Sequence, residues 1–204
     1  MIIDFAGEST ARIYSTMAQT IMPRPIAWVL SENSDKSYNL APFSYFAPVC
    51  SDPPLVMLSI SKKDDGSLKD TRANIMERSD FVIHIPSWEQ LAPMNASAAT
   101  LAAGVSEVDE LGLALADFSG VRLPRLAESR VALACTLHEI KEIGNGPYAM
   151  ILGRIHHVYI ADDAVKEGAD NTLRISPAKL NPVGRLGGPQ YTKMGDIVTL
   201  ARPK

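Results

Sequence analysis

The sequence predicts a mainly β protein, a small and mostly antiparallel barrel with helical insertions. Six or more strand-like runs follow one another along the 204 residues, and two or three short helical patterns lie between them. Direct strand-to-strand connections outnumber strand–helix–strand ones, which favours antiparallel pairing. A closed sheet also leaves few exposed strand edges. With 46% hydrophobic residues, the chain can bury a sizeable core as one domain or as an unequal pair.

The N-terminal half is expected to begin with a helix and to continue with strands. Apolar and small residues at helical spacing predict a helix over 9–21, which must end before the sequence MPRP. In KDTRANIMERS the pattern becomes helical again, with Asp70 or Thr71 as N-cap and with Ile75 and Met76 facing inward. Strands are expected where apolar and β-branched residues run between turn residues, at 25–30 (PIAWVL), 38–41, 55–61 (LVMLSIS) and 81–86 (FVIHIP).

The C-terminal half carries the longest predicted strands. Ser87 and Gln90 form a capping-box pattern that predicts a helix running toward Ala99. Two long strands, near 131–140 and 148–160, are joined by the turn sequence IGNGP. The tail is rich in loop residues, and we expect it to close with a short strand, IVTLA.

The segment 39–54 (NLAPFSYFAPVCSDPP) combines four prolines with three aromatic residues. Proline removes a backbone donor and fits poorly inside a paired strand, whereas the aromatic content is too apolar for a disordered linker. We therefore interpret the segment as a rigid chain, with backbone groups left unpaired by a sheet, that wraps a flat ligand. Phe43, Tyr45 and Phe46 are interpreted as core residues and not as stacking partners.

Five motifs in order resemble the flavin reductase-like family of FMN-binding split barrels: PRPIAWV, NLAPFSYF, PPLVMLSIS, DGSLKDTRANI and PVGRLGGPQY. They run from about Pro23 to Tyr191, so the resemblance implies one FMN-binding domain over 1–204. It also implies a Greek-key split barrel that forms a homodimer, with FMN near the subunit interface. Members of the family include NAD(P)H-dependent flavin reductases, reductase components of two-component monooxygenases and flavoredoxin-like electron carriers.

FMN needs a place for its dianionic phosphate, polar partners for its pyrimidine edge and a flat apolar slot for its ring. The predicted helix start at Lys69, Asp70 and Thr71 suits the phosphate, because free backbone N–H groups and the helix dipole favour an anion there. Thr71 adds a hydroxyl donor and Lys69 a charge, whereas Asp70 would repel phosphate and is interpreted as a cap. An ordinary capped helix with a solvated lysine is the alternative for the same residues.

The proline segment supplies candidates for the other two needs. Asn39 can both donate to and accept from the pyrimidine edge of the flavin. Ala41 and Pro42 are compact enough to lie against the ring. Ser44 can reach the phosphate or the ribityl hydroxyls.

Two serines and two loops complete the set of candidates. Ser59 and Ser61 alternate on one predicted strand and face the same side, which indicates a polar site. The resemblance places Arg185 and Tyr191, in the loop GRLGGPQY, near the flavin, with FMN, the nicotinamide and the dimer contact all open as partners of Arg185. Arg24 is held extended between two prolines and either contacts phosphate or lies at the surface.

Charge and composition exclude several classes of partner. A net charge of −3 gives no field that would attract nucleic acid or an anionic membrane. No apolar run approaches the ~20 residues of a membrane span, and the N-terminus lacks the features of a signal peptide. Cys50 and Cys135 lie far apart in apolar contexts, so we expect two buried, reduced thiols in a cytoplasmic protein.

The remaining polar residues are assigned structural roles. His84 lies in the middle of a predicted strand and is interpreted as a core histidine with satisfied ring nitrogens. His156 and His157 point to opposite faces of their strand, so we predict no metal site. Glu107 and Glu110, in the insertion GVSEVDELGL, are expected on a solvated face, and this insertion is also a candidate lid.

The sequence therefore predicts an NAD(P)H:flavin oxidoreductase in which FMN carries the chemistry and no side chain acts as a catalyst. NADH or NADPH would pass hydride to flavin N5, and a partner oxygenase or another redox partner could receive the reduced flavin. No G-x-G-x-x-G follows a strand, so the nicotinamide would bind in a groove beside the flavin. The alternatives are a flavoredoxin-like carrier with tightly bound FMN, and a barrel that binds haem or pyridoxal phosphate.

Overall fold

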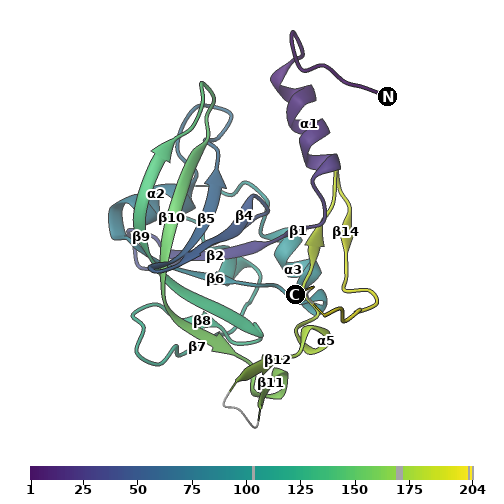
Figure 1. The fold of residues 1–204 in the computed structure, drawn as a ribbon. Helices are drawn as coiled ribbons and strands as arrows, with labels where there is room; N and C mark the ends of the chain where they lie inside the picture. The colour runs from purple at the N-terminus through teal and green to yellow at the C-terminus, as the bar shows by residue number, and fades with distance from the viewer. Residues whose placement is uncertain (103, 169–171, 202, 204) are drawn as a thin grey trace.

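One antiparallel sheet dominates the computed structural model, which describes residues 1–102, 104–168, 172–201 and 203 (Figure 1). Within these residues, seven strands are ordered β3-β2-β6-β9-β10-β5-β4. They are β2 (Ala27–Glu32), β3 (Tyr38–Phe43), β4 (Phe46–Ser51), β5 (Pro54–Ile60), β6 (Asp80–His84), β9 (Val131–Glu142) and β10 (Ala149–Ile160). The mainly β, antiparallel architecture that the sequence predicts is confirmed.

The strands of this sheet are buried on both faces at its centre. Every residue of β2 is buried, and successive side chains of a strand point to opposite faces. Trp28 and Leu30 pack in a core cluster that includes the apolar residues of the 107–126 insertion. Ala27 and Val29 pack in a second cluster, together with Cys135, which is buried as expected. The two clusters explain why the chain is continuously apolar from Ile26 to Leu30.

The proline segment forms two edge strands, which contradicts the expectation of a backbone free of the sheet. Pro42 of β3 lies opposite Trp28, and Pro48 of β4 lies opposite Val56. Each of these strands has a neighbour on one side only, and at such an edge the missing proline N–H can face away from the ladder. Cys50 lies on the outer half of β4 and is exposed, so the expectation of a buried thiol is wrong for this residue.

The three helices that the sequence predicts are present with small differences at their ends, and α5 lies in the tail, where no helix is predicted. They are α1 (Thr10–Thr20), α2 (Asp70–Arg78), α3 (Leu91–Ala96), α4 (Glu107–Glu110) and α5 (Pro177–Leu180). The capping box of Ser87 and Gln90 is confirmed at the turn that precedes α3. Ile75 is fully buried as expected, but Met76 is 46% exposed because it lies on the outer face of α2. None of the described helices is long and apolar enough to span a membrane.

The α4 insertion covers the outer edge of β3. Ser106 Oγ donates to the Tyr38 carbonyl at 2.8 Å, and the Glu107 carboxylate accepts from the Leu40 N–H at 2.9 Å. These two bonds occupy backbone groups that an edge strand would otherwise expose. Glu107 is therefore buried, and its predicted place on a solvated face is wrong, whereas Glu110 is exposed as expected.

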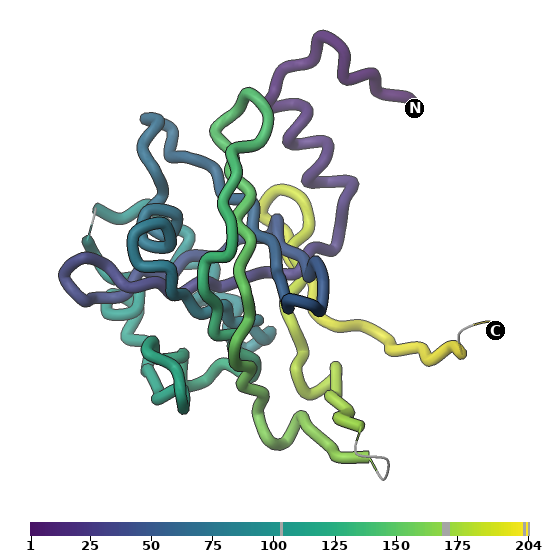
Figure 2. The backbone as a smooth tube through the Cα atoms, turned by 60° about the vertical axis from the view of Figure 1, so that its left-hand side comes forward, coloured from purple at the N-terminus to yellow at the C-terminus, as the bar shows by residue number. Residues whose placement is uncertain are grey.

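Helix α1 stands beside the barrel and is held there by one arginine (Figures 1 and 2). Of its described residues, only Ala18 is buried. Arg24 donates to the carbonyls of Ala18 and Ile21 at 2.5 and 2.6 Å, and to the Leu186 carbonyl of the C-terminal loop at 3.0 Å. It is 8% exposed. Arg24 is therefore not a surface residue, and its guanidinium links the end of α1 to the C-terminal loop.

The C-terminal region adds small sheets and an extended tail. Strands β1 (Arg24–Pro25), β13 (Gly184–Arg185) and β14 (Tyr191–Thr192) form one sheet, and two hairpins pair β7 (Leu115–Ala116) with β8 (Arg125–Leu126) and β11 (Val165–Glu167) with β12 (Leu173–Ile175). The strand predicted at 197–201 is not formed, although the structure describes these residues. The tail runs away from the body of the molecule (Figure 2), and Val198 and Leu200 are 75% and 85% exposed.

Candidate functional site

Helix α2 begins without a capping side chain among the described residues. Lys69 is its N-cap residue, so the prediction of Asp70 or Thr71 in that position is wrong. Asp70 instead pairs with Lys63 through both carboxylate oxygens, at 3.1 and 3.2 Å. The first N–H groups of an α-helix have no acceptor within the helix. The start of α2 therefore presents free backbone donors at the positive end of the helix dipole.

A cavity of about 160 Å³ opens at the start of α2, and we call it the α2 cavity. Strand β3, the turn after α3 and the helix α4 form its other walls. Five of the ten predicted binding residues line it: Asn39, Ala41, Pro42, Lys69 and Thr71. The opposite wall consists of Lys63, Glu107 and residues 97–101, none of which the sequence predicts as part of the site. Nothing in the local pattern of these residues signals a site, because only the fold brings them to β3.

Charges of both signs line the α2 cavity. Lys63 is neutralised by Asp70, whereas Lys69 has no ion-pair partner among the described residues and lies 6.0 Å from the centre of the Phe43 ring. Burial raises the pKa of the Glu107 carboxyl, against the hydrogen bond from the Leu40 N–H, which lowers it. The cavity therefore combines one free ammonium with a carboxyl group that is biased toward its neutral form.

A buried polar network lies behind the cavity and includes two of the predicted residues. Asn39 Nδ2 donates to Thr71 Oγ1 at 2.8 Å and to Ser31 Oγ at 3.3 Å. Asn39, Thr71 and Ser31 are 4%, 1% and 0% exposed. Both amide hydrogens of Asn39 are thus used inside the protein, and they tie β3 to β2 and to α2.

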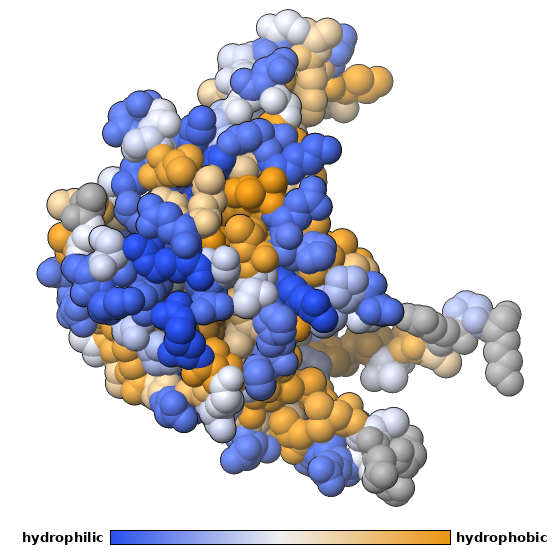
Figure 3. Space-filling model, turned by 90° about the vertical axis from the view of Figure 1, so that its left-hand side faces the viewer, coloured by the Kyte–Doolittle hydropathy of each residue, from blue (hydrophilic) through white to orange (hydrophobic). Residues whose placement is uncertain are grey.

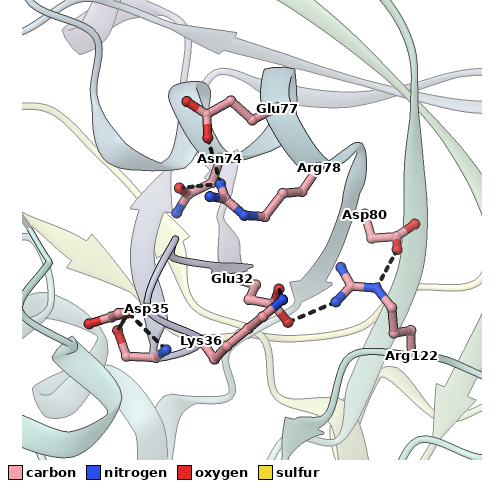
Figure 4. Close-up of polar contacts among 9 residues, drawn as sticks. Glu32, Asp35, Lys36, Asn74, Glu77, Arg78, Asp80 and Arg122 are labelled. Carbon is pink, nitrogen blue, oxygen red and sulfur yellow. Dashed lines mark hydrogen bonds and ion pairs between the residues drawn. The ribbon is translucent and has the colours of Figure 1, made fainter.

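A charged cluster holds the far end of β2, next to this network (Figure 4). The Glu32 carboxylate lies 2.9 Å from Lys36 Nζ and 2.7 Å from Arg122 Nη1, and Arg122 also reaches Asp80 at 2.8 Å. The hydrogen bond from Lys36, together with Arg122, holds the pKa of Glu32 below its usual range. These contacts fix the strand from which Ser31 enters the polar network.

The predicted serines do not join the α2 cavity. Ser44 and Ser59 line a second, more open cavity of about 360 Å³ between β4, β5 and α1, where Arg24 Nε donates to Ser44 Oγ at 3.3 Å. Ser61 is half-buried just after β5 and lines neither cavity. Phe43 lines the α2 cavity, and the next residue, Ser44, lines the second cavity.

Arg185 and Tyr191 lie together in the C-terminal sheet and line neither cavity. The Arg185 guanidinium carbon is 4.4 Å from the centre of the Tyr191 ring, and its Nη2 donates to the Gly188 carbonyl at 2.5 Å. The Tyr191 hydroxyl donates to Asn95 Oδ1 of α3 at 2.7 Å. Within this chain, the two residues link β13, β14 and α3.

His84 is the satisfied core histidine that the sequence predicts. It is fully buried, and its Nε2 accepts from the Leu126 N–H at 3.0 Å. Since a backbone N–H can only donate, the proton of the neutral ring lies on Nδ1, which donates to the Trp28 carbonyl at 3.1 Å. Burial lowers the pKa of His84 to about 4.

An apolar groove of about 730 Å³ runs between α1 and the barrel, and we call it the α1 groove. Tyr14 and Met17 of α1 face Tyr45, Ile143 and the hairpin between β9 and β10 across it. The Tyr14 and Tyr45 rings lie 6.0 Å apart, and Tyr14 is 50% exposed. The N-terminal segment stands clear of the body, whose face around α2 is mainly hydrophilic with apolar patches above and below (Figure 3).

The residues around the α2 cavity fit the phosphate end of FMN. Uncapped helix donors, the Thr71 hydroxyl and the Lys69 ammonium are groups that bind a phosphate dianion. The cavity is smaller than the roughly 300–1,000 Å³ of pockets that enclose a whole ligand. It therefore suits the phosphate and part of the ribityl chain, whereas the ring would lie outside it.

Comparison with known proteins identifies the family to which this chain belongs. The profile of the flavin reductase like domain matches residues 17–176. An uncharacterized protein of Halalkalibacterium halodurans is 35% identical over 194 residues, which cover 93% of this chain and 90% of that protein. Nitrilotriacetate monooxygenase component B from Bacillus cereus is 29% identical, with a TM-score of 0.90 over 98% of both chains.

A second solved structure, 2-nitrobenzoate 2-nitroreductase from Pseudomonas fluorescens, is also 29% identical. Its TM-score is 0.88, over 100% of this chain and 96% of that protein. Together with the profile match, which spans more than half of the chain, these similarities establish the family. The chain belongs to the flavin reductase-like family and has its split-barrel fold.

Proposed function

We propose that this protein is an NAD(P)H-dependent flavin oxidoreductase that binds the phosphate of FMN in the α2 cavity. The uncapped start of α2 carries the proposal, because backbone N–H groups, the Thr71 hydroxyl and the Lys69 ammonium meet there. Such donors are favourable for a dianion at a helix N-terminus. Two relatives, named as a monooxygenase component and a nitroreductase, support a redox role.

The protein's part in this reaction is to bind and orient. Bound FMN supplies a hydride acceptor at N5. Lys69 and Thr71 would hold the phosphate, and the short apolar side chains of Ala41 and Pro42 on β3 would let the ring lie close to the strand. NADH or NADPH would bind in a groove beside the ring, since the sequence contains no dinucleotide-binding motif. No side chain of the α2 cavity needs to exchange a proton.

We also propose that the protein is a homodimer that supplies reduced flavin to an oxygenase or to another redox partner. The exposed apolar face of α1 supports the dimer, since a helix of 11 residues is marginal in water without packing partners. The name of the Bacillus cereus relative, a monooxygenase component, supports the oxygenase partner.

Anaerobic reduction of the purified protein tests the proposed reaction. We expect a yellow protein, or one that turns yellow with added FMN, whose visible absorbance bleaches rapidly with NADH or NADPH. A yellow protein that only dithionite bleaches would instead be an electron carrier. A protein that takes up no flavin would be neither an oxidoreductase of this kind nor a flavin-containing electron carrier, and it contradicts the proposal.

Binding of two flavins tests the phosphate site separately. Lys69→Ala together with Thr71→Ala should weaken FMN much more than riboflavin, which lacks the phosphate. Each charge-assisted bond contributes roughly 1.5–3 kcal/mol when it is buried. Lys141→Ala, at an exposed lysine of β9, is the control and should change neither affinity. Equal losses for both flavins would show that this helix start does not hold the phosphate.

A further inference from the structure

The hydrogen bond between Asn39 and Thr71 constrains what the threonine hydroxyl can do. Asn39 Nδ2 lies 2.8 Å from Thr71 Oγ1, and both residues are at least 96% buried. An amide nitrogen can only donate, so Thr71 Oγ1 is the acceptor. The hydrogen of the Thr71 hydroxyl must therefore point away from Asn39, while the same residue lines the α2 cavity.

The guanidinium of Arg78, which can only donate hydrogen bonds, sets the orientation of the neighbouring Asn74 amide. Arg78 Nη1 lies 3.3 Å from Asn74 Oδ1, so Asn74 presents its oxygen to the guanidinium (Figure 4). Its Nδ2 then donates to Asn33 Oδ1 at 2.8 Å and to Ser31 Oγ at 3.2 Å. Asn39 Nδ2 donates to the same Ser31 oxygen. Ser31 thus receives two amide donors and holds Asn39 in place beside Thr71.

We propose that Asn39 is a positioning residue, which commits the Thr71 hydroxyl to donate into the α2 cavity. This inference rests on the proposed function, because the group that receives the hydrogen is a phosphate oxygen of FMN. A threonine near a helix start can otherwise turn its hydroxyl toward neighbouring backbone carbonyls. With the acceptor side of Thr71 occupied by Asn39, the hydroxyl is pre-oriented as a donor before the anion arrives. Asn39 then favours FMN over riboflavin without touching the ligand's phosphate.

A double-mutant cycle separates this role from a direct contact between Asn39 and the flavin. Asn39→Leu keeps the side-chain size and Thr71→Val keeps the shape, and the apoprotein of each variant is titrated with FMN and with riboflavin by flavin fluorescence. We expect each single change to lower the preference for FMN by about tenfold, the effect of one lost hydrogen bond. In the Thr71→Val background, Asn39→Leu should cause no further loss of preference.

Two results would overturn the positioning role. If Asn39→Leu weakens FMN and riboflavin equally, the amide contacts the flavin ring or serves only the scaffold. If its effect on the preference is the same with and without the Thr71 hydroxyl, Asn39 acts independently of Thr71. A wild-type protein that binds FMN and riboflavin equally well contradicts the phosphate site, and with it this inference.

Asn39→Asp provides a second cycle if the leucine variant does not fold. A carboxylate of the same shape can only accept, so it takes the Thr71 hydrogen and mimics a reversed amide. Its charge also repels phosphate, but this repulsion is present in both backgrounds. If Asn39→Asp lowers the preference for FMN more when Thr71 is present than in the Thr71→Val background, the inference is supported. Equal losses in the two backgrounds overturn it. Asn145→Leu, in the exposed turn between β9 and β10, is the control and should leave the preference unchanged.

Discussion

At the scale of single residues, His84 couples the stability of the fold to pH. Its two ring nitrogens bond to backbone groups of β2 and of the insertion, and there is no solvent around the ring to accommodate a charge. Protonation would require Nε2 to give up the Leu126 N–H. The pKa of about 4 in the folded state, against an ordinary 6.5, expresses this cost.

We predict that stability falls as the pH decreases from about 6.5 to about 4. In this window the unfolded chain binds a proton at His84 and the folded chain does not, so acid favours the unfolded state. Within the window, His84 alone changes the free energy of unfolding by up to about 1.4 kcal/mol per pH unit, and it contributes no pH dependence above or below the window. Urea unfolding at several pH values measures it.

His84→Gln is the matched variant, because its amide has no proton to gain in this range. Carboxyl groups also titrate at acid pH, so the informative quantity is the difference in the free energy of unfolding between wild type and variant. That difference should depend on pH only between about 4 and 6.5. A pH-independent difference would mean that the histidine titrates equally in both states.

At the scale of elements, one glycine of strand β10 makes room for an aromatic ring of β6. Gly153 lies at a shift in register between β9 and β10. A Cβ at this position would lie 2.5 Å from Cζ of Phe81, a buried residue of β6. Only a residue without a side chain therefore allows the Phe81 ring to pack against β10 at this point.

We predict that Gly153→Ala destabilises the protein by about 1–3 kcal/mol through overpacking. The melting temperature should fall by roughly 2–12 °C for a chain of this length. Gly146→Ala is the control, because its new Cβ would meet only Tyr148 at an ordinary 3.6 Å. Adding Phe81→Leu to Gly153→Ala should recover part of the loss, whereas an unchanged melting temperature for Gly153→Ala alone would show that the ring moves aside freely.

At the scale of the whole molecule, one chain exposes more surface than a compact monomer of its mass. Its accessible surface is 12242 Å² for 22.1 kDa. The usual scaling gives about 9,300 Å² for that mass. The excess of roughly 2,900 Å² exceeds the ~800 Å² that each partner buries in a standard interface. Helix α1 and the C-terminal tail project from the body of the molecule and contribute to this excess surface, and both carry exposed apolar side chains.

We predict that the protein sediments at twice 22.1 kDa at micromolar concentration. Met17→Lys in α1 together with Ile21→Lys at its C-cap, both exposed apolar residues, should yield the monomer mass because two charges would have to be buried in the contact. Met76→Lys, at a comparably exposed methionine of α2, is the control and should leave the dimer intact. A wild-type monomer that still binds FMN contradicts the dimer.

Local pattern was sufficient for three helices and for six of the seven strands of the main sheet, but not for β4, the small sheets or α5. Amphipathic spacing, turn residues and the capping box of Ser87 located these predicted helices and strands to within a few residues. The tail strand at 197–201 was wrong because β-branched residues predict a strand only where a neighbouring strand exists to pair with. Met76 was misplaced because the face of a short helix depends on what packs against it.

The sequence by itself determined the strand and helix pattern, the family motifs and five residues that meet in one cavity. Only the tertiary structure decided that the proline segment forms both edges of the sheet, that Lys69 starts α2, and that Glu107 closes the cavity wall. It also decided that Asn39 directs its amide to Thr71, 32 residues away. Periodicity reports which residues are buried along one element, whereas edge position, hydrogen-bond partners and cavity walls depend on contacts between elements distant in the chain.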